Sequence, residues 1–116
     1  MRVAGLGFRK GTAVESLRAV LAKVGPFDAI ATAATKVDDP GFASLVKELC
    51  LPLHAVSQEA LAASERAGSG QAKALYGTGS VAESAALAAA GPGARLVVPR
   101  VKGPDGKAVA AVAERT

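Results

Sequence analysis

Two glycine-rich segments of the sequence share a pattern that favours binding of an anion. Residues 11–16 (GTAVES) and 79–84 (GSVAES) each place a hydroxyl side chain three positions before a glutamate, which is the capping-box pattern of a helix start. A further glycine pair accompanies each segment, in residues 5–7 (GLG) and 77–79 (GTG). The free N–H groups and the positive dipole end of a helix N-terminus attract negative charge. We therefore expect both segments to present backbone N–H groups to an anionic ligand.

The glycine spacing does not fit a nucleotide cofactor. The segment from Gly5 through Gly7 to Gly11 is one residue longer than the dinucleotide fingerprint allows. Thr35 and Lys36 stand where that motif needs an acidic residue after its second strand. The sequence also lacks the Gly-Lys-Ser/Thr of a Walker loop. We therefore expect no cofactor.

No nucleophile–base pair or metal-ligand set can be assembled from the sequence. Ser80 has no histidine partner and is expected to cap a helix, while Glu15 and Glu83 are better explained by the capping boxes than by catalysis. The single histidine, His54, lies in an apolar run and is expected to be a polar strand residue. The single cysteine, Cys50, excludes an intramolecular disulfide and is expected to be buried at a helix end. These features favour binding over catalysis, with no metal site.

Composition indicates one small domain without nucleic-acid or membrane partners. The chain has 116 residues, half of them hydrophobic, so we expect a single domain over residues 1–116. Aromatic residues make up 3% and tryptophan is absent, which argues against stacking on single-stranded nucleic acid. The net charge of +4 is spread along the chain without a basic run. No segment approaches the roughly 18 apolar residues that span a membrane, and the expected location is the cytoplasm.

The hydrophobic pattern alternates between strands and helices. Strands are expected at residues 2–6, 28–34, 51–55, 95–100 and 107–112, with a short apolar segment at 74–76. Helices are expected at residues 12–24, from 40 to about 49, 57–66 and 80–90. Asp105-Gly106 predicts a hairpin between the last two strands, and Pro99 suggests that its strand lies at an edge. The fold class is therefore α/β, a three-layer α/β/α sandwich with a mixed, mostly parallel sheet of about five strands ending in a hairpin.

Four segments together resemble one protein family. They are residues 3–11 (VAGLGFRKG), 35–38 (TKVD), 77–87 (GTGSVAESAAL) and the closing hairpin with VPRVK at 98–102. In this order they resemble CobE and the C-terminal domain of CbiG, which act at the corrin-ring stage of cobalamin (vitamin B12) biosynthesis. The resemblance covers essentially the whole chain, and 77–87 is its most specific part.

The resemblance implies a precorrin or corrin intermediate as the ligand, with other cobalamin-pathway enzymes as possible partners. Such a macrocycle has apolar faces and is ringed by acetate and propionate carboxylates. Helix N-termini and cationic side chains suit those carboxylates, and glycines let the backbone approach the ring. The residues that the resemblance and this chemistry assign to ligand binding are Gly5, Gly7, Arg9, Lys10, Gly11, Lys36, Gly77, Thr78, Gly79, Ser80 and Glu83.

Two alternatives to simple ligand binding stay open. One is a hydrolase acting on a (cobalt-)precorrin lactone as CbiG does, with Lys36, Asp38 and Glu83 as acid–base candidates. CbiG carries an additional N-terminal region that this sequence lacks, and its Lys-x-x-Glu-like pattern is here Lys36-Val37-Asp38-Asp39. The other alternative is an interaction module that docks on a pathway enzyme and touches no small molecule.

Overall fold

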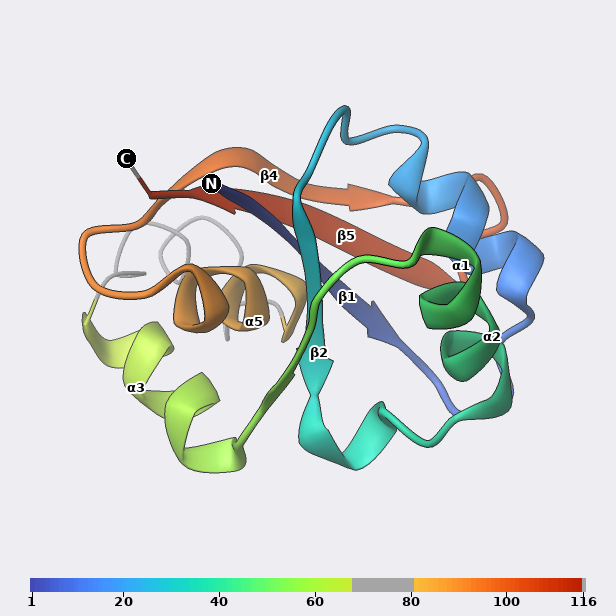
Figure 1. Cartoon of the computed structure of the whole chain (residues 1–116), viewed down its shortest axis with the longest axis horizontal. Helices are drawn as coiled ribbons and strands as arrows, with labels where there is room; N and C mark the ends of the chain where they lie inside the picture. Colours follow the sequence, from blue (N-terminus) through green and yellow to red (C-terminus); the bar gives the residue numbers. More distant parts are fainter. Residues whose placement is uncertain (68–80, 116) are drawn as a thin grey trace.

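The computed structural model describes residues 1–67 and 81–115 and is shown in Figure 1. The five strands are β1 (Arg2–Phe8), β2 (Ala29–Ala33), β3 (Leu53–Val56), β4 (Arg95–Lys102) and β5 (Ala108–Glu114). The helices are α1 (Val14–Leu21), α2 (Pro40–Leu49), α3 (Gln58–Ala67) and α5 (Val81–Ala90), with a 3-10 turn at Ala34–Lys36. The short apolar segment at 74–76 and the second glycine loop lie outside the described residues.

The strands form one mixed sheet in the order β3-β2-β1-β5-β4. β1 pairs in parallel with β2, and β2 with β3, while β5 is antiparallel to both β1 and β4. β5 is therefore the one strand that runs against the other four described strands. The expected mixed, mostly parallel sheet with a terminal hairpin is confirmed, and Pro99 does lie on an edge strand.

Helices cover both faces of the sheet, because alternate residues along each strand enter different hydrophobic cores. Ala4, Leu6 and Phe8 of β1 pack in a core with side chains of α1 and α2. Val3 of the same strand packs instead in a second core with side chains of α3 and α5. In Figure 1, α1 and α2 accordingly lie together, apart from α3 and α5. No helix in the described part of the chain is long and apolar enough to cross a membrane.

Helix α1 begins differently from the expectation. Its N-cap is Ala13, no side chain caps it, and the Thr12 hydroxyl donates instead to the Arg9 carbonyl at 2.7 Å. The first capping box was therefore a wrong prediction, since the hydroxyl is used in the preceding turn. The helix also ends at Leu21 rather than at Val24. Ser57, by contrast, accepts the Ala60 N–H at 3.1 Å and caps α3 as expected.

Side chains from two distant segments tie α1 to the terminal hairpin. The Ser16 hydroxyl donates to Asp105 in the β4–β5 turn, and the other carboxylate oxygen of Asp105 accepts the Lys107 N–H at 3.0 Å. Both hydrogen bonds lower the pKa of Asp105 below its ordinary range, and the bond from Ser16 has the larger effect. The turn that precedes β5 is thereby held against the start of α1.

One expectation about burial was wrong. Cys50 does follow the last residue of α2, but it is exposed rather than buried. It adopts a left-handed conformation with φ 54°, which ends the helix by turning the chain away from it. Cys50 therefore serves as the C-cap residue of α2 and does not pack in the core.

Candidate functional site

The carboxyl ends of the parallel strands border a cavity of about 490 Å³, which we call the strand-end pocket. Its lining comes from the ends of β1 and β2, the first turns of α3 and α5, and the terminal hairpin. The lining residues are Gly7, Phe8, Arg9, Thr32, Ala33, Thr35, Lys36, Gln58, Leu61, Val81, Arg100, Lys107 and Val109. Ligands of open α/β sheets bind at this end of the strands, so the location fits a binding site.

Positive charge dominates the strand-end pocket. Its described lining contains four cationic side chains, Arg9, Lys36, Arg100 and Lys107, and no aspartate or glutamate. Leu61, Val81 and Val109 add apolar surface. A cavity of this composition suits a ligand that combines negative charge with apolar area.

Three of the pocket's cationic side chains take part in none of the ion pairs that the described residues form. The ion pairs among described residues join Arg2 and Arg95 to Glu114 and Arg18 to Glu48, all outside the pocket lining. Arg9, Lys36 and Lys107 form no salt bridge within the described ranges. Their positive charge is therefore available to an anionic ligand.

Lys36 is held by the end of β1. Its ammonium donates to the Phe8 carbonyl at 2.5 Å and lies 5.3 Å from the centroid of the Phe8 ring. The Phe8 ring stacks in turn on Phe42, with centroids 5.5 Å apart. An ammonium has three donors, and the Phe8 carbonyl takes one. Lys36 is thus fixed in the pocket wall by a carbonyl and a ring, rather than by a salt bridge to Asp38 or Asp39.

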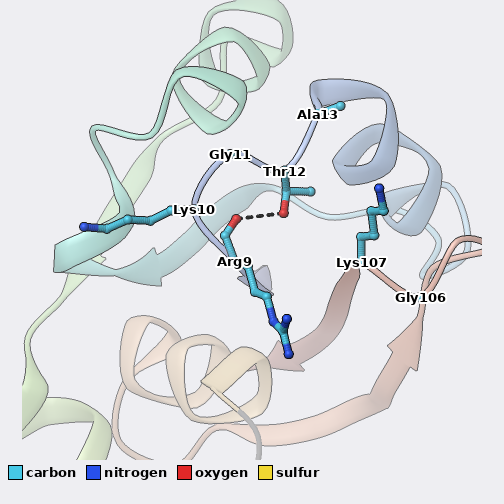
Figure 2. A pocket seen from close by; sticks show the side chains of 7 residues that line it. All are labelled: Arg9, Lys10, Gly11, Thr12, Ala13, Gly106 and Lys107. Carbon is cyan, nitrogen blue, oxygen red and sulfur yellow. Dashed lines mark hydrogen bonds between the residues drawn. The ribbon is translucent and has the colours of Figure 1, made fainter.

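The loop after β1 also lines two further cavities. Gly11, at φ +84°, donates its N–H to the buried Asp39 carboxylate at 2.8 Å. Figure 2 shows the cavity of about 520 Å³ lined by Arg9, Lys10, Gly11, Thr12, Ala13, Gly106 and Lys107. In this view Lys10 points to the opposite side of the loop from Arg9 and Lys107.

Arg9 and Lys107 line both this cavity and the strand-end pocket. The third cavity, of about 470 Å³, is lined by Lys10, Gly11, Thr35, Asp38, Asp39 and Pro40. Lys10 and Gly11 therefore line the neighbouring cavities and not the strand-end pocket itself.

The two glycines of β1 have different surroundings. A Cβ at Gly5 would lie 2.0 Å from the backbone carbonyl oxygen of Ala82 in α5. A Cβ at Gly7 would meet the side chain of Val109 at 3.0 Å, and Gly7 lines the strand-end pocket. Gly7 thus borders the pocket, whereas the close approach at Gly5 is to helix α5. Gly5 is therefore not part of the strand-end pocket.

The three acid–base candidates do not share one cavity. Lys36 lines the strand-end pocket, Asp38 lines the third cavity, and Glu83 lines neither of them. Glu83 is 1% exposed, and its Oε2 accepts the Arg100 N–H at 3.1 Å. Within residues 1–67 and 81–115, no group of three or more histidine, cysteine or acidic side chains could hold a metal ion. Gly77, Thr78, Gly79 and Ser80 lie outside the described residues.

Several lining residues were not expected from the sequence. Arg100 and Lys107 are the most important, because they supply half of the pocket's described cations. Phe8 pairs with Ala108 in the antiparallel register of β1 and β5, which places Lys107 at the carboxyl end of β1. The antiparallel pairing of β5 with β1, had it been predicted, would have identified Lys107 as a residue near the carboxyl end of β1. Arg100 lies at a register shift between Val98 and Val101 of β4, which has no comparably simple sequence signal.

Comparisons with known proteins agree with one another. The family described as cobalamin synthesis G C-terminus matches residues 2–113. The crystal structure of the cobalamin biosynthesis protein chiG from Agrobacterium tumefaciens str. C58 is 42% identical, with a TM-score of 0.82 over 100% of this chain and 99% of that one. CobE, a protein from the cobalamin (vitamin B12) biosynthetic pathway, is 33% identical, with a TM-score of 0.79 over 100% of this chain and 91% of CobE. The curated proteins give no match.

Proposed function

Because the chain belongs to the cobalamin synthesis G C-terminus family, we propose that it binds a polycarboxylate precorrin or corrin intermediate in the strand-end pocket. It is a cobalamin biosynthesis protein of the CbiG/CobE type. The proposal adds to this the class of ligand and the place where it binds.

The observation that carries the proposal is the gathering of four cations in a lining without acids. The acetate and propionate carboxylates at the rim of a corrin are flexible and negatively charged. A guanidinium such as that of Arg9 or Arg100 can bind one carboxylate through two parallel hydrogen bonds, whereas Lys36 and Lys107 act as point charges. The rim of the macrocycle would thus bind to cations from four different parts of the chain.

The apolar lining suits the face of the same ligand. Leu61 of α3, Val81 of α5 and Val109 of β5 line one cavity with the cations. Val81 is 47% exposed, so it is one of the large hydrophobic side chains left open to solvent. Covering it with a macrocycle would remove apolar surface from water.

We favour binding over hydrolysis by Lys36, Asp38 and Glu83 because these residues lie in different surroundings. Lys36 and Asp38 face different cavities, and Glu83 is buried with an oxygen bound to a backbone N–H. A general base must come within hydrogen-bond reach of the proton that it removes. These positions support a protein that holds or delivers the intermediate.

Two corrinoids that differ only in their side-chain charge would test the proposal. We expect cobyrinic acid, with free carboxylates, to bind saturably and at least about tenfold more tightly than its heptaamide, since each charge-assisted hydrogen bond contributes about 1.5–3 kcal/mol. Isothermal titration calorimetry and the corrin absorption bands both report the binding. Higher salt should weaken only the carboxylated ligand.

Mass spectrometry of the recovered ligand completes this test. With a lactone-bearing precorrin as the ligand, an unchanged mass after incubation agrees with binding alone, whereas hydrolysis of its lactone changes the mass. Absence of saturable binding by cobyrinic acid, or equal affinity for the two corrinoids, would rule out the proposed recognition of carboxylates.

A further inference from the structure

Strand β4 is irregular next to the residue that it contributes to the strand-end pocket. Val98 pairs with Val112 and Val101 with Ala110, so three steps along β4 match two along β5. One residue of β4 is therefore extra, which defines a β-bulge. Pro99 lies inside this bulge and has no N–H to offer the ladder.

The bulge decides which face of the sheet Arg100 occupies. Val98 and Val101 both pack against the core beneath α1 and α2, although three positions separate them. In a regular strand, residues three apart point to opposite faces. The bulge restores Val101 to that core and leaves Arg100 on the face that α5 covers, where it lines the pocket.

A buried carboxylate accepts the N–H at the bulge. The Arg100 N–H donates to Glu83 Oε2 at 3.1 Å. Glu83 is in the first turn of α5 and is 1% exposed. Removing this buried acceptor would leave a backbone donor without the partner that it has here. The bond also joins the first turn of α5, which bears Val81, to the bulge.

We propose that Glu83 is a positioning residue for the strand-end pocket. By accepting the Arg100 N–H, it stabilises the bulge, directs the Arg100 side chain to the pocket and fixes the first turn of α5 beside it. Glu83 therefore acts through Arg100, and not as an acid or base on the ligand. The identity of the anion that Arg100 meets rests on the function proposed above, whereas the link from Glu83 to Arg100 does not.

The link can be tested in the ligand-free protein by nuclear magnetic resonance. Glu83→Gln keeps a side-chain acceptor, whereas Glu83→Met has a similar size and removes it. We expect Glu83→Met to shift the backbone N–H and side-chain Nε–H signals of Arg100 and to speed exchange of that amide by at least about tenfold. Glu83→Gln should largely keep the wild-type signals. Unchanged Arg100 signals in Glu83→Met would overturn the proposal.

A double-mutant cycle with cobyrinic acid tests the consequence for binding. We expect Glu83→Met to weaken affinity about tenfold in the wild-type background and by less than about twofold when Arg100→Gln is already present, because both changes remove the same contact. Equal losses in the two backgrounds would contradict a role through Arg100. If the wild-type protein binds no cobyrinic acid, the proposed function fails, and the Arg100 signals still decide the role of Glu83.

Discussion

Replacing Gly5 with alanine is expected to lower the free energy of unfolding by at least about 3 kcal/mol, or to prevent folding. The new Cβ would lie 2.0 Å from the carbonyl oxygen of Ala82 and 2.8 Å from the backbone nitrogen of Ala86. Both are backbone atoms of α5, so no change of side-chain rotamer relieves the clash. β1 lies in the middle of the sheet and is paired on both edges, and therefore cannot move away alone.

Urea denaturation or thermal unfolding measures this effect, and Gly7→Ala is the matched control. It lies two positions along the same strand, and its Cβ would be 3.0 Å from a methyl group of Val109 and 3.5 Å from the nearest backbone atom. A side chain can move by a few tenths of an ångström, so we expect a loss below about 1.5 kcal/mol. Similar losses in the two variants would show that α5 does not pack against β1 as closely as described.

Neutralising two cations of the strand-end pocket should have the largest effect on ligand binding. We expect the double variant Arg9→Gln and Lys36→Gln to bind cobyrinic acid about 100-fold more weakly than the wild type, since each lost charge-assisted hydrogen bond costs about tenfold or more in affinity. The two side chains come from the loop after β1 and from the turn after β2. The dependence of affinity on salt should also become less steep.

The control keeps the change in net charge but leaves the pocket intact. Arg95 lies in β4, 75% of its side chain is exposed, and it is outside the strand-end pocket. Lys47 is an exposed residue near the end of α2. We expect the double variant Arg95→Gln and Lys47→Gln to keep the wild-type affinity within about threefold at physiological salt, where distant exposed charges are largely screened. A comparable loss in both double variants would mean that overall charge, and not this pocket, attracts the ligand.

The sequence predicted the features of the fold that depend on local chemistry. The Asp105-Gly106 turn joins two antiparallel strands, and Ser57 begins α3 because its hydroxyl accepts a nearby N–H. Pro99 was placed correctly on an edge strand because proline lacks the donor that a central strand needs.

Features that depend on distant contacts escaped the sequence analysis. The pattern at Thr12 and Glu15 looked like a capping box, but the Thr12 hydroxyl binds the Arg9 carbonyl. The glycine at position 5 looked like a ligand contact, whereas its lack of a side chain admits the backbone of α5.

Some residues of the candidate site were likewise predicted from the sequence, and others were missed. Gly7, Arg9 and Lys36 were expected from the family resemblance and from the chemistry of carboxylate binding, and they do line one pocket. Arg100 and Lys107 were missed because their places depend on the bulge in β4 and on the register of β5 against β1. The register of β5 against β1 comes from pairing between segments about 100 residues apart, which one sequence pattern does not contain.

The most direct test of the central claim is to map bound cobyrinic acid by amide chemical shifts. The pocket assignment predicts that the largest shifts occur at residues of the strand-end pocket, including Gly7, Lys36 and Val109, with small shifts for Arg18 and Glu48 on the outer surface of α1 and α2. Shifts centred on α1 and α2, or no saturable shifts at all, would contradict binding of a carboxylate-rimmed corrin at the ends of the strands.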